Sequence, residues 1–216
     1  GTGNLLARTL GTPADPLVAT RVALTGDDRR IDVGRLRADD NDYDLTFLVM
    51  AGTGLDAAIM ENTAESLKAR IGTLAYVLSG LRAMWVKSKR VTLQVDDGPE
   101  LRRPSRTVLV GNSGTLLGGL VLMPEATVDD GTLDIVNIAP NSFAGWVAVL
   151  VAGDHRKRRG HRRVEHWQAK SVVITTEQPQ AAQVDGDPIG EVSRLEIRVD
   201  PAALVVRVQP EREQEH

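Results

Sequence analysis

Short stretches in which apolar and polar residues alternate recur along the chain, and this pattern predicts half-buried β-strands. The predicted strands cover residues 30–36, 44–50, 91–95, 106–111, 133–136, 171–176, 194–199 and 203–208. Gly, Pro and Asp residues separate them at short intervals, which favours tight turns between neighbouring strands. The sequence therefore predicts an α+β fold that is mainly β and contains an antiparallel β-sandwich.

A different spacing of apolar residues predicts helices. Apolar residues three and four positions apart form one stripe along residues 67–85, as expected for a long core helix that begins at Asn62 or Thr63. Residues 141–153 have the length and apolar content of a shorter helix. Residues 5–10 predict a short helix capped by Asn4, and residues 15–23 predict a loosely amphipathic one.

Composition is that of an ordinary globular protein, since 42% of the 216 residues are hydrophobic and 25% are charged. The absence of cysteine excludes disulfides and thiolate chemistry. The most apolar run, residues 143–152, is about half of the ~20 residues that a membrane-spanning helix needs.

Basic residues gather in one short segment of a chain whose net charge is −3. This basic island has six positive charges and no acid: Arg156, Lys157, Arg158, Arg159, Arg162 and Arg163. A basic island in an otherwise acidic chain indicates a local anionic partner and does not indicate nucleic-acid binding. Two interpretations stay open, a solvated loop and a peripheral contact with an anionic membrane beside the apolar run.

Four places carry residues suited to phosphate or metal chemistry. The turn Gly1-Thr2-Gly3-Asn4 precedes a helix, where backbone N–H groups can meet a phosphate, although a plain helix cap has the same pattern. The others are Asp32, the turn Asp129-Asp130-Gly131 and the turn Asp185-Gly186-Asp187. An Asp-Gly step between strands is first of all a hairpin signal. Two carboxylates in one turn also disfavour each other's ionisation, which makes one of them a better base.

The order of these motifs along the chain resembles that of one known family. The matching segments are Gly1-Thr2-Gly3-Asn4-Leu5-Leu6-Ala7-Arg8, Ile31-Asp32-Val33-Gly34, Ala51-Gly52-Thr53-Gly54-Leu55-Asp56, Pro124-Glu125-Ala126 with Asp129-Asp130-Gly131-Thr132-Leu133-Asp134, and Val184-Asp185-Gly186-Asp187-Pro188. They resemble the diacylglycerol kinase catalytic-domain family of lipid kinases, which includes sphingosine kinases and bacterial relatives. The resemblance implies transfer of the γ-phosphoryl group of ATP to a hydroxyl of a diacylglycerol-like lipid, with Mg²⁺ bridging the phosphates. It also implies the second domain of the NAD kinase/diacylglycerol kinase-like fold.

The resemblance assigns catalytic roles to three aspartates. Asp187 is the expected general base. The family usually has glutamate at this place, so the carboxylate of Asp187 reaches one methylene less far. Asp185 is expected to help hold metal or nucleotide, and Asp32 to support the magnesium network.

The same resemblance assigns binding roles to two turns. Gly1-Thr2-Gly3-Asn4 is expected to lie next to the nucleotide phosphates. Asp130, with the backbone carbonyls of Thr127 and Thr132, is expected to hold a second, structural Mg²⁺. Some bacterial members have an acid at the position of Leu5, so the glycine loop here is closer to that of sphingosine kinases.

Family members also have a Gly-Gly-Asp-Gly-Thr nucleotide motif upstream of the glycine loop, and this chain contains no such motif. The chain is therefore expected to be the C-terminal part of a longer kinase and to be inactive alone. Residues 1–28 would be a remnant of the N-terminal nucleotide-binding domain. Residues 29–209 would form the β-sandwich lipid-substrate domain, and residues 210–216 a frayed tail.

The resemblance implies a lipid substrate, and a cytoplasmic location is expected. Contact with the inner face of the membrane through the basic island stays open, and no nucleic-acid partner is expected. A homodimer is compatible with it. Two other functions stay open: a catalytically silent binding or oligomerisation module of the same fold, and a relative of NAD kinase.

Overall fold

The computed structural model describes residues 4–54, 88–114, 123, 125–139 and 164–210. Five sequence predictions fall wholly or mostly outside these residues: the long helix along 67–85, the shorter helix at 141–153, the loop residues Gly1, Thr2 and Gly3, the basic island, and the frayed tail at 210–216. The elements, in chain order, are α1 (Leu5–Thr9), α2 (Pro16–Thr25), β1 (Asp27–Ala38), β2 (Leu45–Phe47), β3 (Met50–Thr53), β4 (Lys89–Val95), β5 (Glu100–Ser105), β6 (Thr107–Gly111), β7 (Leu133–Ile138), β8 (Val164–Ala169), β9 (Ser171–Val184) and β10 (Asp187–Val208).

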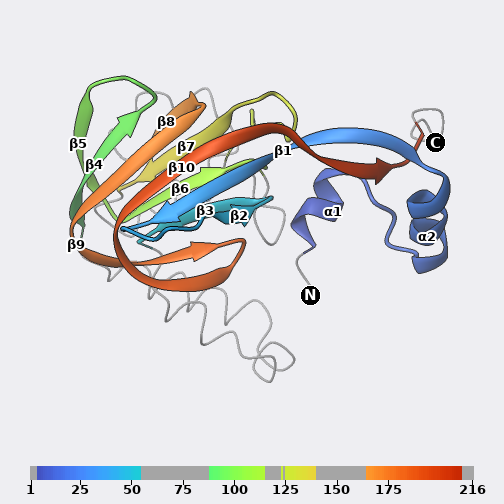
Figure 1. The fold of residues 1–216 in the computed structure, drawn as a ribbon, viewed down its shortest axis with the longest axis horizontal. Helices are drawn as coiled ribbons and strands as arrows, with labels where there is room; N and C mark the ends of the chain where they lie inside the picture. The colour runs from blue at the N-terminus through green and yellow to red at the C-terminus, as the bar shows by residue number, and fades with distance from the viewer. Residues whose placement is uncertain (1–3, 55–87, 115–122, 124, 140–163, 211–216) are drawn as a thin grey trace.

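The strands form one antiparallel sheet within the described residues, in the order β2-β1-β10-β9-β3-β6-β7-β8. The hairpin β4–β5 joins this sheet through β9. β9 pairs with β4 along residues 172–176 and with β3 along residues 182–184, so one strand serves two neighbours on the same edge. β10 follows β9 through this change with a register shift between Val192 and Arg194. Long strands that bend in this way carry a sheet around a corner (Figure 1).

The bent sheet encloses one large apolar core. Its buried side chains come from every strand except β5: Leu36, Ala38, Phe47, Ala51, Val91, Leu93, Val108, Val110, Leu133, Ile135, Ala169, Val172, Ile174, Ala182, Val184, Val192, Leu195 and Ile197. A smaller cluster on β6 and β7 contains Leu109, Val136 and Ile138 with Met123. The prediction of a mainly β, antiparallel fold is confirmed.

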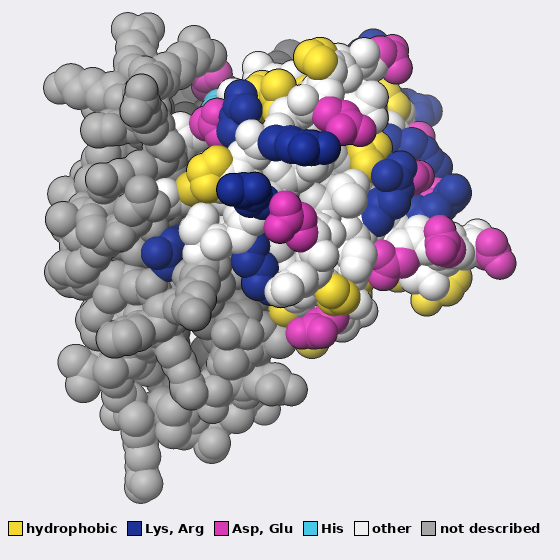
Figure 2. All heavy atoms as spheres, turned by 90° about the vertical axis from the view of Figure 1, so that its left-hand side faces the viewer, with side chains coloured by type: hydrophobic (Ala, Val, Ile, Leu, Met, Phe, Trp, Pro, Cys, Tyr) yellow, Lys and Arg dark blue, Asp and Glu magenta, His cyan; other side chains and the backbone are white. Residues whose placement is uncertain are grey.

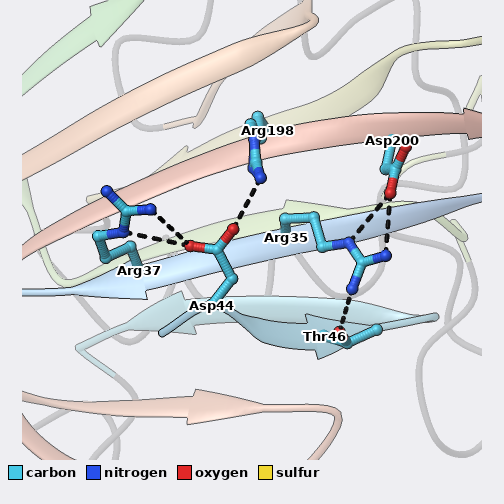
Figure 3. A network of polar contacts seen from close by, with 6 residues as sticks. All are labelled: Arg35, Arg37, Asp44, Thr46, Arg198 and Asp200. Atoms are coloured by element: carbon cyan, nitrogen blue, oxygen red, sulfur yellow. Dashed lines mark hydrogen bonds and ion pairs between the residues drawn. The ribbon is translucent and has the colours of Figure 1, made fainter. Parts of the chain in front are cut away.

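The outer face of β1, β2 and β10 carries paired charges (Figure 3). Arg35 binds Asp200 through two nitrogens, at 2.9 and 3.1 Å. Asp44 accepts from Arg37 and Arg198 with its two oxygens. Such surface ion pairs contribute about 0–1 kcal/mol each, so their main effect is to keep this face polar. At the end of the sheet formed by β4, β5 and β9, charged side chains are likewise interspersed with scattered apolar ones among the coloured atoms (Figure 2).

Two edge strands were not predicted from the sequence. β5 contains two arginines and Pro104, and β8 carries Glu165, His166 and Gln168, so neither shows a clean alternation. Within the described residues β5 pairs only with β4, and β8 only with β7. An edge strand has one neighbour and tolerates proline and charge, which hides it from a pattern based on burial.

The sequence Ala51-Gly52-Thr53-Gly54 has two glycines, as a turn would, but most of it is the buried strand β3. A Cβ at Gly52 would collide with the carbonyl oxygen of Val108 on the neighbouring β6. Glycine is required here because two strands approach closely, and a turn is not involved.

The N-terminal helices lie at one end of the sheet, where β1 and β10 continue as a two-stranded ribbon (Figure 1). Asp15 caps α2 by accepting from the backbone of Leu17 and Val18. Asn4 stands at the N-cap of α1, as the sequence predicts, but its side chain makes no cap hydrogen bond. Neither α1 nor α2, the helices within the described residues, has the length and apolar character needed to cross a membrane.

Candidate functional site

Three aspartates end strands in the same way. Asp39, Asp96 and Asp185 directly follow β1, β4 and β9, and their φ angles are 49°, 47° and 50°. Left-handed backbone is rare for residues other than glycine, and aspartate is among those that tolerate it. Each of these aspartates donates its own N–H to a carbonyl of a neighbouring segment and accepts backbone N–H groups from that segment with its carboxylate. We call this arrangement an aspartate clamp.

Asp185 forms the clamp with the most hydrogen bonds. Its carboxylate accepts from Leu48 at 2.8 Å, and from Val49 and Met50 at 2.9 Å each. Its own N–H donates to the carbonyl of Met50 at 2.8 Å. Both carboxylate oxygens are therefore engaged by the loop between β2 and β3, and the position of the acidic turn relative to that loop is fixed.

Asp187 has a different environment although it is only two residues away. It begins β10 and is exposed, and its carboxylate accepts no hydrogen bond from any residue that the structure describes. The turn that carries it is braced by Gly186, whose N–H donates to the side chain of Gln183 at 2.7 Å, and by the clamp at Asp185. A free carboxylate on a rigid turn is suited to accept a proton or to bind a cation.

Asp32 is buried, with 2% of its surface exposed. Its Oδ1 accepts from the N–H of Ala202 at 2.7 Å, and its Oδ2 accepts from the N–H of Gly131 at 2.6 Å. It stands where the register between β1 and β10 shifts, and Ala202 opposite has a positive φ of 52°. Asp32 therefore joins an irregular stretch of β10 to the turn at Asp129–Gly131.

The turn after Val128 is closed by its own side chains. Asp130 Oδ1 accepts from the N–H of Thr132 at 2.9 Å and from its hydroxyl at 2.8 Å, while Gly131 has a φ of 73°. Asp129 pairs with Arg29 on β1 at 2.7 Å. Asp130 and Thr127 are exposed, and Asp130 Oδ2 has no partner among the residues that the structure describes.

Of the glycine loop, only Asn4 belongs to the described residues, and it is exposed. Within the described residues, a side-chain hydrogen bond joins the helix that follows to the segment after β6, between the hydroxyls of Thr9 and Ser113 at 2.7 Å. The glycine loop therefore precedes a helix that contacts the end of β6.

The carboxylates and hydroxyls at these turns are hard oxygen donors of the type that Mg²⁺ prefers. Within the described ranges, no three His, Asp or Glu side chains converge as a ready metal site. The donors compatible with Mg²⁺ are the free oxygens of Asp187 and Asp130. A cation held there would complete its coordination with carbonyls, water or substrate phosphates, as Mg²⁺ commonly does.

The clamps at Asp39 and Asp96 were not foreseen from the sequence. The signal was present, because in each case an aspartate directly follows an alternating apolar run and precedes Asp or Gly. Short polar side chains that bond to nearby backbone favour such strand ends.

The fold defines a mainly antiparallel β domain whose acidic turns lie between its strands. The model of the YegS C-terminal NAD kinase beta sandwich-like domain matches residues 49–208. The chain belongs to this family.

Curated relatives extend the similarity to nearly the whole chain. The Probable lipid kinase YegS-like of Pseudomonas putida is 32% identical over 94% of this chain and 64% of its own length. The Diacylglycerol kinase of Staphylococcus carnosus is 29% identical over 89% of this chain and 61% of its own length. The chain thus spans about three fifths of the length of these relatives.

Solved structures show the same fold. The crystal structure of a diacylglycerol kinase from Bacillus anthracis str. Sterne aligns with a TM-score of 0.67 and 22% identity. The alignment covers 97% of this chain and 65% of that one. The expected resemblance to diacylglycerol kinases is confirmed at the level of family and fold.

Proposed function

We propose that this chain is the lipid-substrate part of an ATP-dependent lipid kinase, in which Asp187 is the general base. The observation that carries the proposal is a contrast between three aspartates. Both carboxylate oxygens of Asp32 and of Asp185 accept hydrogen bonds from backbone N–H groups. The carboxylate of Asp187 is exposed and has no hydrogen-bond partner among the described residues. The names of the relatives, a lipid kinase and a diacylglycerol kinase, support this class of reaction.

In the proposed reaction a lipid hydroxyl oxygen attacks the γ-phosphorus of ATP, and the bond to the β–γ bridging oxygen breaks, releasing ADP. Asp187 accepts the hydroxyl proton, so that the attacking oxygen gains electron density as the new bond forms. Bound Mg²⁺ would neutralise phosphate charge, and a second, structural Mg²⁺ would have Asp130 and the backbone carbonyls of Thr127 and Thr132 among its ligands. Asp185 and Asp32 hold the backbone that presents Asp187 and do not need to touch the substrate.

The domain assignment is also a proposal. The sheet runs from Asp27 to Val208, which leaves α1 and α2 outside it. On α2, Leu17 and Leu24 are 82% and 75% exposed, and they lie seven residues apart on one helix face. This supports the proposal that the helices within residues 1–28 pack against the part of the relatives' length that this chain does not span, whereas Asp27 and Asp28 already belong to β1.

The proposal that the basic island rests on an anionic membrane is retained. It concerns residues outside the described ranges and depends on charge alone. A kinase whose substrate is a membrane lipid gains from such a contact, because the lipid hydroxyl then lies near the site.

The test is a phosphoryl-transfer assay on a full-length protein that contains this chain, with labelled ATP, Mg²⁺ and diacylglycerol in mixed micelles. Asp187→Asn is expected to lower kcat by about 10²–10⁴-fold, the usual contribution of a general base. The matched control is Asp97→Asn, since Asp97 is also an exposed acid that follows a clamp aspartate. Its kcat should equal that of the wild type.

Each outcome decides one part of the proposal. Wild-type protein that transfers no phosphate to any lipid of a panel would reject the function, and transfer to NAD instead would establish the NAD kinase alternative. Full turnover by Asp187→Asn would reject only the assignment of the base. The present chain without the rest of the protein is expected to show no turnover.

A further inference from the structure

Asn112 lies where the acidic motifs meet. It follows β6, and 1% of its surface is exposed. Its Nδ2 donates to the backbone carbonyl of Asp32 at 2.9 Å and to that of Leu48 at 3.4 Å. Its backbone N–H donates to the carbonyl of Val49 at 2.9 Å. One residue thus contacts both the irregular stretch of β1 and the loop between β2 and β3.

The loop between β2 and β3 is held from two sides. The N–H groups of Leu48, Val49 and Met50 point to the carboxylate of Asp185. The carbonyls of Leu48 and Val49 accept from Asn112. Each peptide group of this short loop therefore bonds to Asp185 or to Asn112. A shift of Asn112 would move the same loop whose N–H groups bind Asp185.

Asn112 also connects the loop to Asp32 and to α1. The residue whose carbonyl it binds, Asp32, holds the N–H of Gly131 with its carboxylate. The next residue, Ser113, contacts Thr9 on α1 with its hydroxyl at 2.7 Å and the carbonyl of Val49 with its N–H at 3.3 Å. The helix after the glycine loop, the Asp129–Gly131 turn and the Asp185 clamp therefore belong to one continuous hydrogen-bond network.

We infer that Asn112 is a positioning residue, which fixes the loop between β2 and β3 and thereby the place at which Asp187 is presented. The carboxamide suits this role because its NH₂ group has two donors and faces two carbonyls. Alanine would remove the donor from both carbonyls, in a buried hydrogen bond at Asp32 and a partly buried one at Leu48, which is unfavourable. The catalytic part of the inference rests on the proposed function, and the structural part does not.

A second buried asparagine provides a matched control. Asn137 on β7 is 2% exposed, and its Nδ2 also donates to two acceptors, the carbonyl of Pro104 at 3.2 Å and the carboxylate of Glu165 at 3.1 Å. It bonds to none of the acidic motifs. Asn112→Ala and Asn137→Ala therefore remove the same group from equally buried sites, and only the first removes it from the network.

The experiment measures backbone amide exchange and kinetics on the full-length protein for both variants. In Asn112→Ala we expect the amides of Leu48, Val49 and Met50 to exchange about five to tenfold faster, the effect of one or two lost hydrogen bonds. We expect kcat to fall about 10- to 100-fold because the base is displaced, with KM for ATP nearly unchanged. Asn137→Ala should leave these three amides and kcat at wild-type values.

The outcomes separate this inference from the proposed function. Wild-type exchange at the three amides together with wild-type kcat in Asn112→Ala would overturn the inference, as would the same changes in Asn137→Ala. A wild-type protein with no kinase activity would reject the proposed function, and the amide exchange would still decide the structural role. If Asn112→Ala does not fold, Asn112→Ser is used, because its hydroxyl can donate to only one carbonyl and should accelerate exchange by less.

Discussion

Replacing Asp185 separates a structural aspartate from a chemical one. Asp185→Ala removes the acceptor of three backbone N–H groups at 2.8–2.9 Å and places alanine at a φ of 50°. Asp185→Gly removes the same acceptor and accepts that φ freely. Asp185→Asn retains one side-chain oxygen and a residue type that tolerates left-handed backbone. The three variants therefore distinguish the hydrogen bonds from the backbone strain.

The expected losses follow from the contacts. A hydrogen bond to a charged group contributes about 1.5–3 kcal/mol to stability. The contribution is smaller for the bonds from Leu48 and Val49 to Asp185, because they lie at the surface and water can replace the carboxylate. We expect Asp185→Ala to lower the free energy of unfolding by about 3–4 kcal/mol, of which about 1 kcal/mol is strain. Asp185→Gly should cost about 2–3 kcal/mol, and Asp185→Asn about 1 kcal/mol.

The assay is urea denaturation of the chain, with the free energy of unfolding obtained from the midpoint and slope. Asp187→Asn is the contrasting variant, and its effect should stay within about 0.5 kcal/mol because its carboxylate has no partner among the described residues. Asp96→Ala, which loses a clamp of two amides, should fall between them. The reasoning is refuted if Asp187→Asn lowers the free energy of unfolding as much as Asp185→Ala does, or if Asp96→Ala lowers it more than Asp185→Ala does.

Two further predictions concern the core and the basic island. Gly34→Ala should lower the free energy of unfolding by about 1–3 kcal/mol, because a Cβ there would overlap the buried ring of Phe47. In a protein that already carries Phe47→Leu, Gly34→Ala should lower it by less. Strictly additive changes in the free energy of unfolding would contradict the overlap. Replacing the six basic residues of the island by glutamine should abolish sedimentation of the protein with anionic vesicles at low salt, and sedimentation with neutral vesicles should not change. Each basic residue contributes about 1 kcal/mol of binding free energy near an anionic surface. Unchanged sedimentation with anionic vesicles would reject the membrane contact.

Much of the fold was predictable because its signals are local. Alternation marked most of the core strands, and the Asp-Gly steps marked turns at Asp130–Gly131 and Asp185–Gly186 where the structure has them. The same residues carried the resemblance that the family model confirms. The edge strands β5 and β8 were missed because their stability comes from a single neighbour, and their composition does not show it.

The sequence by itself determined which residues are acidic, where the chain turns, and to which family the order of motifs belongs. It did not determine which carboxylate is free. That depends on N–H groups far away in the chain, since Asp185 meets Leu48 across 137 positions and Asp32 meets Ala202 across 170. Only the tertiary structure brings these amides close to Asp185 and leaves Asp187 without them. For this reason Asp185 is a clamp and Asp187 is a candidate base, although the two carboxylates look alike in the sequence.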